Sequence, residues 1–320
     1  MKNIDYSVII PCLNEQDSIE ELFNRISNIF KGMQSSFEII FIDDGSTDDS
    51  WQIIKNLSKV YPSVKGFSFR KNFGKSIAFS CGFEYATGDI IFTIDCDLQD
   101  NPEEIPKFIK KLDEGYDLVS GWKKKRNDSL DKVVASRIFN FFTSKLTGVK
   151  IHDFNCGFKA YKRKVVKSLD LYEDLFRFIP AFANWNGFKV GEVLVEHTSR
   201  KHSKSKYGPS RLARGFFDLI TILFLTKYLK KPLHFFGILG ILIFMIGLII
   251  NVYLSILWLN GNVIGNRPLL ILGTLMMIVG MQFVSTGLLG EMIAHFQSKL
   301  VKQSFPIKET TLKNRQYKEI

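Results

Sequence analysis

The 320-residue sequence has few cysteines, and their spacing matches neither a disulfide framework nor a zinc site. Cys12, Cys81, Cys96 and Cys156 are scattered, with no Cys-x-x-Cys pair among them. We therefore expect small buried thiols in a reducing compartment. The first residues also lack a long apolar stretch, so we expect no secretory signal peptide and a soluble part that stays in the cytoplasm.

The sequence does not favour two further classes of protein, those that bind dinucleotides and those that bind nucleic acids. No Gly-x-Gly-x-x-Gly motif follows the first predicted strand, so nothing favours a dinucleotide-binding fold. The net charge of +11 is compatible with a nucleic-acid partner, but the basic residues cluster beside apolar segments. An anionic membrane surface or phosphorylated substrates explain that distribution better, and we expect no nucleic-acid partner.

Long apolar runs are absent before about residue 208 but dominate the last third of the chain. Residues 235–259 and 268–290 contain no charged side chain, and about 20 apolar residues suffice to cross a bilayer. The turn between them has only Arg267, whereas lysines flank the pair on both sides. The sequence thus predicts a two-helix transmembrane hairpin (232–298) in an integral protein of the cytoplasmic membrane, with both termini in the cytoplasm.

The segments on either side of the hairpin are polar or amphipathic. Residues 209–231 combine apolar positions with basic ends, which is typical of an amphipathic helix at a membrane interface. Residues 299–320 are predicted to be a cytoplasmic tail, poorly ordered from Ser304 onward.

Strands and helices alternate in residues 1–208, which we interpret as one cytoplasmic α/β domain. Such alternation favours a doubly wound, mainly parallel sheet. Short buried strands are predicted at 6–11, 37–43, 64–68, 90–95 and 117–120, and helices at about 18–30, 47–61, 75–86 and 102–114.

Acidic residues follow two of these strands. Asp43 and Asp44 end the second strand, and Asp95 and Asp97 end the fourth. Ligands of parallel sheets bind beyond the carboxyl ends of the strands. Such carboxylates suit a divalent cation, Mg²⁺ or Mn²⁺, together with a substrate phosphate. The alternative is that both acidic pairs only cap the helices that follow.

Four segments together resemble glycosyltransferase family 2. They are Val8–Glu15 (VIIPCLNE), Ile42–Asp48 (IDDGSTD), Arg70–Gly74 (RKNFG) and Asp95–Gln99 (DCDLQ). More narrowly, they resemble its polyprenyl-phosphate branch, the relatives of dolichol-phosphate mannose synthase and bactoprenol glucosyltransferases. The resemblance covers nearly the whole chain and implies a GT-A fold.

The resemblance assigns a donor site residue by residue. Asp95, Asp97 and Gln99 match the segment that holds the metal and the diphosphate, with Asp97 as the direct ligand. The positions that match nucleotide contacts, or lie where a basic side chain reaches the nucleotide, are Pro11, Asn14, Glu15, Asp44 and Lys75.

The acceptor side is implied in the same way. Asp153 leads the segment that lies near the acceptor in the family and is the predicted base. Arg126 and Arg137 match basic positions between the sheet and the acceptor site. Arg200 and Lys206 belong to a loop that matches Arg-x-x-Gly-x-Ser-Lys-Tyr, except for a serine in place of the glycine, and are assigned to donor or acceptor phosphate. A polybasic patch that binds anionic lipid is the alternative for this loop.

The function that the resemblance implies is an inverting, metal-dependent transfer of one sugar. The donor would be a UDP- or GDP-linked sugar, and the acceptor undecaprenyl or dolichyl phosphate in the bilayer; a homo-tetramer is compatible with the relatives. A processive polysaccharide synthase is one alternative, but no tryptophan follows an arginine, so its Gln-x-x-Arg-Trp motif is missing. A non-catalytic membrane scaffold or flippase component is the other, and the two acidic strand ends argue against it.

Overall fold

The computed structural model describes residues 4–124, 140–141, 143–145, 147–168, 175–196, 232–261, 268–297 and 307–311. The chain divides into two units. One is an α/β unit, to which the short segment 307–311 also belongs, and the other is a helical unit formed by 232–261 and 268–297. The predicted amphipathic helix at 209–231 lies outside the described residues.

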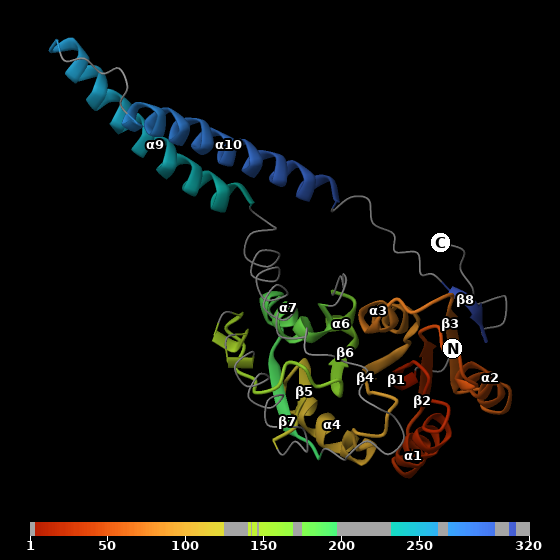
Figure 1. The fold of residues 1–320 in the computed structure, drawn as a ribbon. Helices are drawn as coiled ribbons and strands as arrows, with labels where there is room; N and C mark the ends of the chain where they lie inside the picture. The colour runs from red at the N-terminus through yellow and green to blue at the C-terminus, as the bar shows by residue number, and fades with distance from the viewer. Residues whose placement is uncertain are drawn as a thin grey trace. The chain divides into compact units, whose positions relative to one another are not determined.

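Strands and helices alternate through most of the α/β unit, as the sequence predicts (Figure 1). In chain order its elements are β1 (Ile4–Cys12), α1 (Ile19–Gly32), β2 (Phe37–Asp43), α2 (Ser50–Val60), β3 (Val64–Phe69), α3 (Lys75–Tyr85), β4 (Gly88–Thr93), the 3₁₀ helix η1 (Pro102–Glu104), α4 (Ile105–Asp113), β5 (Leu118–Trp122), β6 (Lys159–Lys162), α6 (Arg163–Val166), the 3₁₀ helix η2 (Leu175–Phe178), α7 (Ile179–Trp185), β7 (Val190–Leu194) and β8 (Ile307–Thr310).

The described strands form one sheet in the order β7-β5-β6-β4-β1-β2-β3-β8. The four strands β3-β2-β1-β4 are all parallel. This part of the sheet confirms the predicted doubly wound, mainly parallel arrangement. Beyond β4 the sheet is mixed, because β6 runs antiparallel to both β4 and β5. The sheet as a whole is therefore mixed, which is compatible with the GT-A fold that the resemblance implies.

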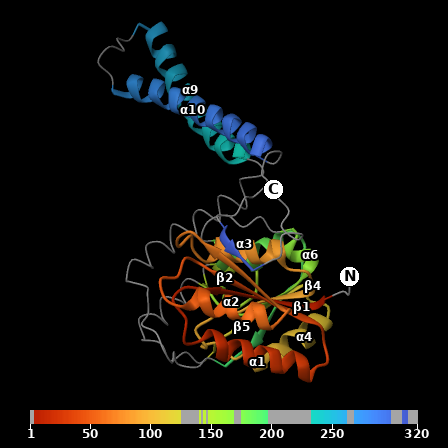
Figure 2. The ribbon, with the colours of Figure 1, turned by 90° about the vertical axis from the view of Figure 1, so that its right-hand side faces the viewer.

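Helices cover both faces of the sheet (Figure 2). Val8 and Ile10 of β1 point to one face and pack among buried side chains of α1, α2 and α4. Ile9 points to the other face and packs with residues of α3, α6 and α7. This alternation follows from the two-residue period of a strand, and it explains why the central strands are apolar on both sides.

The strand that leads to the acidic site begins and ends two residues earlier than the sequence predicts, at Gly88 and Thr93. β4 ends at Thr93, which lies opposite Ile9 of β1 and Lys159 of β6, the last paired positions. Asp95 consequently lies two residues beyond the strand, in the loop at the sheet edge. A loop position leaves its carboxylate free to face a neighbouring helix rather than a neighbouring strand.

The expectation of a poorly ordered tail is wrong for Ile307–Thr310, which form β8 antiparallel to β3. The main-chain N–H of Gly66 donates to Thr311 Oγ1 (2.8 Å), and the N–H of Thr311 donates to the carbonyl of Gly66 (3.0 Å). Trp51 Nε1 donates to Glu309 Oε2 at 2.8 Å. Main-chain pairing with an otherwise open edge strand orders this polar segment.

The helical unit consists of α9 (Pro232–Leu259) and α10 (Pro268–Gln297), which pack against each other. Both are long and apolar enough to cross a membrane, and most of their large apolar side chains are exposed. A Cβ on Gly240 would lie 2.6 Å from the carbonyl oxygen of Gly280, and the reverse also holds. Close backbone approach at small residues is typical of helix pairs in membranes, so these two candidate spans match the predicted hairpin.

Candidate active site

Three parallel strands end beside one another, and a polar loop follows each of them. β1 pairs with both β2 and β4, so the carboxyl ends of all three meet at one edge of the sheet. In open parallel sheets this edge is where ligands bind. The described residues that the sequence assigns to the donor lie in β1, in these three loops and at the start of α3.

The loop after β1 is bonded to the loop after β2. Asn14 has a φ of 52°, a left-handed conformation that asparagine adopts more readily than most residues. Its Oδ1 accepts the N–H of Thr47 (2.8 Å), and its own N–H donates to Ser46 Oγ (2.9 Å). The N–H of Glu15 donates to Ser50 Oγ (2.9 Å). Asn14 and Glu15 therefore lie at a hydrogen-bonded junction of two strand-end loops.

Asp44 anchors a third loop. Its Oδ1 accepts the N–H of Phe73 (2.7 Å) and its Oδ2 accepts the N–H of Gly74 (2.9 Å). Burial raises the pKa of the Asp44 carboxyl and outweighs these two donors, which lower it. Asp44 thus fixes the loop that leads into α3, and its contact with a nucleotide stays a prediction. Pro11 is buried in β1, opposite Ile42 of β2.

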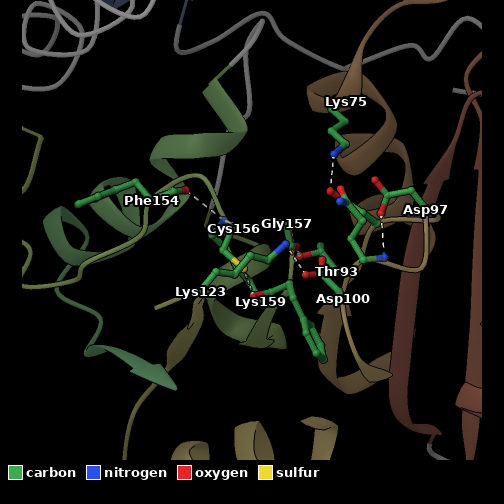
Figure 3. Close-up of polar contacts among 12 residues, drawn as sticks. Lys75, Thr93, Asp97, Asp100, Lys123, Phe154, Cys156, Gly157 and Lys159 are labelled. Atoms are coloured by element: carbon green, nitrogen blue, oxygen red, sulfur yellow. Dashed lines mark hydrogen bonds and ion pairs between the residues drawn. The ribbon is translucent and has the colours of Figure 1, made fainter. Parts of the chain in front are cut away.

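The first residue of α3 forms an ion pair with the loop after β4 (Figure 3). Lys75 Nζ lies 2.7 Å from Asp95 Oδ2, whereas the buried Oδ1 of Asp95 accepts no hydrogen bond from the part of the chain that the structure describes. Burial raises the pKa of Asp95, but Lys75, Lys123 and Lys159 together outweigh it and hold the pKa below its ordinary value. Asp95 is therefore ionised at neutral pH, and its Oδ1 is a buried oxygen that no described residue hydrogen-bonds.

The loop after Asp95 is constrained from Asp97 to Asp100. Leu98 is buried and has a φ of 57°, which is unusual for a leucine. The N–H of Gln99 donates to Asp97 Oδ1 (3.3 Å). Asp100 ends the loop in a buried ion pair with Lys123 (2.5 Å). These contacts hold the half-buried Asp97 and Gln99 in place near Asp95.

Asp153 belongs to the same neighbourhood. Its side chain is buried, and Oδ1 accepts the N–H of Asn155 (3.0 Å). The carboxylates of Asp153 and Asp95 both favour the charged form of Lys159, although burial of Lys159 is the larger effect and lowers its pKa. The structure thus brings the predicted acceptor-side carboxylate and the predicted donor-side carboxylate close to one buried lysine side chain, that of Lys159.

Three residues of this site were missed by the sequence analysis: Lys123, Lys159 and Gly157. Lys123 opens a basic run in the sequence, but its partner Asp100 could not be foreseen. Gly157 packs directly on Asp95, because a Cβ at this glycine would lie 2.5 Å from Asp95 Oδ1. The only sequence signal for Lys159 and Gly157 is their place in the segment that begins at Asp153.

Four basic residues that the resemblance assigns to the site have no place in the described structure. Arg126, Arg137, Arg200 and Lys206 all lie outside the described residues, so their roles stay predictions.

The oxygen ligands of the site suit a divalent cation that binds together with phosphate. Among the residues that the structure describes, no three His, Cys, Asp or Glu side chains are grouped to hold a metal ion. Asp95 nevertheless has a buried oxygen that accepts no hydrogen bond from any described residue, and Asp97 lies two residues further on. Mg²⁺ in substrate sites is commonly bound by one or two carboxylates plus water and substrate phosphates. Asp95 and Asp97 fit that mode of binding better than a preformed cage.

Comparison with known proteins places the chain in a family. Residues 7–170 match the family described as Glycosyl transferase family 2. The dodecaprenyl-phosphate galacturonate synthase of Rhizobium johnstonii is 35% identical over 304 residues, which cover 92% of this chain and 89% of that protein. The undecaprenyl-phosphate 4-deoxy-4-formamido-L-arabinose transferase of Shewanella sediminis is 37% identical over 303 residues, covering 93% and 89%.

A solved structure supports the fold assignment. Glucosyl-3-phosphoglycerate synthase from Mycobacterium tuberculosis, in complex with Mn²⁺ and uridine-diphosphate-glucose, has a TM-score of 0.52 and 22% identity over 69% of this chain and 78% of that chain. At this identity the likeness shows the GT-A fold alone. The protein belongs to glycosyltransferase family 2, and it is a glycosyltransferase.

Proposed function

We propose that this protein transfers one sugar from a nucleotide sugar to a polyprenyl phosphate at the surface of a membrane. The observation that carries the proposal is the presence, in one chain, of a carboxylate site at a sheet edge and an exposed apolar helix pair. A transferase that acts on soluble acceptors has no need of such helices. The head group of a polyprenyl phosphate lies at the bilayer surface, where a hairpin would hold the site.

The similar proteins support the acceptor. Both named relatives are described as acting on polyprenyl phosphates, dodecaprenyl in one case and undecaprenyl in the other. Their identity with this chain extends over more than nine tenths of its length, so it includes the helical unit as well as the sheet. Their sugars differ, and the acceptor is therefore the part of the reaction that they share.

On the donor side, the nucleotide would bind at the strand-end loops that are held together by the hydrogen bonds of Asn14, Glu15 and Asp44. Lys75 would exchange part of its interaction with Asp95 for the diphosphate, since an ammonium can serve both anions. Asp95, Asp97 and Gln99 would hold Mg²⁺ or Mn²⁺, which when bound supplies positive charge to the departing diphosphate.

On the acceptor side, an oxygen of the lipid phosphate attacks the anomeric carbon of the sugar. The bond between that carbon and the nucleotide diphosphate breaks, and its electron pair leaves with the diphosphate, so the configuration inverts. A phosphate monoester has a second pKa of about 6, and its attacking oxygen is already largely ionised at neutral pH. Asp153 therefore has more to contribute by orienting the reactants than by accepting a proton.

The predicted basic residues complete this account. Arg126, Arg137, Arg200 and Lys206 would bind the phosphates of donor and acceptor. Residues 1–208 would form the cytoplasmic domain, followed by the interfacial helix and the hairpin, with the short outer turn on the opposite side of the cytoplasmic membrane. Assembly into a homo-tetramer belongs to the same proposal.

The test is incubation of the purified full-length protein with undecaprenyl phosphate, Mg²⁺ or Mn²⁺ and a panel of UDP- and GDP-sugars. Mass spectrometry of the lipid fraction is expected to show one added sugar residue with one donor. Undecaprenol, which lacks the phosphate, serves as the matched control acceptor and is expected to stay unmodified. Addition of many sugars would favour a processive synthase, and no product with any donor would contradict the proposal.

A further inference from the structure

One row of polar side chains crosses four neighbouring strands. Thr93 of β4 lies opposite Lys159 of β6, Lys159 lies opposite Ser120 of β5, and Ser120 lies opposite Glu192 of β7. Residues that lie opposite each other in paired strands share a face of the sheet. Thr93, Ser120 and Lys159 are buried, and a buried polar group is costly unless it finds a partner. We call these four residues the polar row.

Every member of the polar row bonds to the main chain of one short segment, residues 152–157. Glu192 Oε2 accepts the N–H of His152 (2.8 Å), and Ser120 Oγ donates to the carbonyl of Asp153 (3.3 Å). Lys159 Nζ donates to the carbonyl of Phe154 (3.3 Å) and to that of Cys156. Thr93 Oγ1 donates to the carbonyl of Gly157 (2.8 Å). The segment thus crosses the four strands along the row, and part of this arrangement is visible in Figure 3.

The two ends of the segment belong to the two halves of the site. Asp153, near its start, is the acceptor-side carboxylate. Gly157, at its end, packs on Asp95, with no room for a Cβ between them. The segment therefore links Asp153 to Asp95 over a few residues, and its placement sets the distance between the acceptor and donor sides.

Lys159 is the centre of this arrangement. Its side chain is fully buried, yet it holds two carbonyl groups of the segment and interacts with the carboxylates of both Asp95 and Asp153. Lysine is among the residues least often buried. A buried apolar side chain of similar length would fill the same space but could not fix the two carbonyl groups.

We propose that the polar row, with Lys159 at its centre, positions the segment 152–157 so that the acceptor oxygen and the donor sugar are aligned for transfer. This inference rests on the proposed function. Because the side chains of the row bond to the main chain of the segment, they are positioning residues and act through Asp153 and Asp95.

The test is Lys159→Met in the full-length protein, with kcat and the KM of each substrate measured for folded, monodisperse enzyme. Small displacements of reacting groups reduce rates by about 100-fold, so kcat is expected to fall by that order while the KM of the donor changes by less than about 2-fold. Lys162→Met on the same strand, where the lysine is partly exposed, is the control and should retain the kcat of the unaltered enzyme. A merely structural role would lower the yield or the melting temperature and leave the kcat of the folded fraction unchanged.

Two milder variants decide the matter if Lys159→Met does not fold. Ser120→Ala and Thr93→Val each remove one hydroxyl donor to the segment, and each is expected to lower kcat by about 3- to 10-fold. Full kcat in folded Lys159→Met, or in both milder variants, would overturn the inference. An inactive unaltered protein would instead overturn the proposed function, so the two failures are distinguishable.

Discussion

The ammonium group of Lys75 lies 2.7 Å from Oδ2 of Asp95, which joins the start of α3 to the loop after β4. The position of Lys75 depends in turn on Asp44. This carboxylate accepts hydrogen bonds from the main chain of Phe73 and Gly74, the two residues that precede Lys75. The acidic strand ends of β2 and β4 are therefore connected through one helix start. Under the proposed function, this connection would place two carboxylates from separate strands beside one donor.

Lys75→Met is expected to impair use of the donor. The variant removes a charged hydrogen-bond donor from the proposed diphosphate site, and such bonds contribute about 1.5–3 kcal/mol. We expect kcat/KM for the nucleotide sugar to fall by about 10- to 100-fold in steady-state kinetics. Lys31→Met, at the exposed end of α1, is the control. An unchanged kcat/KM in Lys75→Met would exclude a donor role for this lysine.

Gly157→Ala is expected to disturb Asp95 directly. The added methyl group would lie 2.5 Å from Asp95 Oδ1, so either the carboxylate or the segment at 157 must move. We expect transfer to fall by at least about 10-fold, since small displacements at a reacting centre have large effects on rate. Gly32→Ala is the matched control, because no atom of the described residues lies within 4 Å of its Cβ position. Equal rates for the two variants would show that Asp95 tolerates the displacement.

The burial and contacts of the Glu38 carboxylate predict how the stability of the α/β unit depends on pH. This carboxylate of β2 is buried, accepts hydrogen bonds from Ser7 Oγ (2.6 Å) and the N–H of Thr87 (2.6 Å), and pairs with Lys65 at 2.6 Å. Burial raises the pKa of Glu38, but Lys65 and the hydrogen bonds outweigh it, and the net pKa is lowered. The stabilisation is therefore complete above the ordinary glutamate value of 4.5 and is lost as the pH falls through the lower pKa of the folded state.

Glu38→Gln should reveal this contribution. At pH 7 we expect the variant to lose about 2 kcal/mol of unfolding free energy, since it weakens a buried hydrogen-bond network. The difference from the unaltered protein should shrink as the pH falls below 4.5, measured by unfolding of the full chain in detergent. Glu84→Gln, at an exposed glutamate, should show no such trend. A difference that is constant between pH 7 and pH 3 would contradict the assignment.

The parallel half of the sheet could be predicted from the sequence because its strands are apolar on both faces. Phe37–Asp43, for example, is an uninterrupted buried strand with the predicted bounds. β6, β7 and β8 could not be predicted in the same way. They are four or five residues long and contain charged residues, so their apolar pattern is weak. β8 in particular is ordered by pairing with a distant strand, which no local pattern reveals.

The residues of the candidate site show the same contrast between local sequence patterns and long-range pairing. Asp95 and Asp97 could be proposed from the sequence because acidic residues directly after a buried strand indicate a site for a cation and a phosphate. No local pattern marks the other three residues of the site. Only the folded structure places Lys123 beside Asp100, Lys159 beside the segment 152–157, and Gly157 beside Asp95. A lysine in a sequence is expected at the surface, and the long-range pairing of β6 buries this one.

The central claim is that the acidic loop after β4 serves sugar transfer to a lipid phosphate, and Asp97→Ala tests it most directly. The unaltered protein and the variant are incubated side by side with undecaprenyl phosphate, the active nucleotide sugar and a divalent cation, and the glycolipid is quantified by mass spectrometry. Asp89→Ala, at an exposed carboxylate of β4, is the control. We expect the variant to form at least about 100-fold less product, with an unchanged melting temperature and Asp89→Ala fully active. Product formation by folded Asp97→Ala at the rate of the unaltered protein would contradict the account.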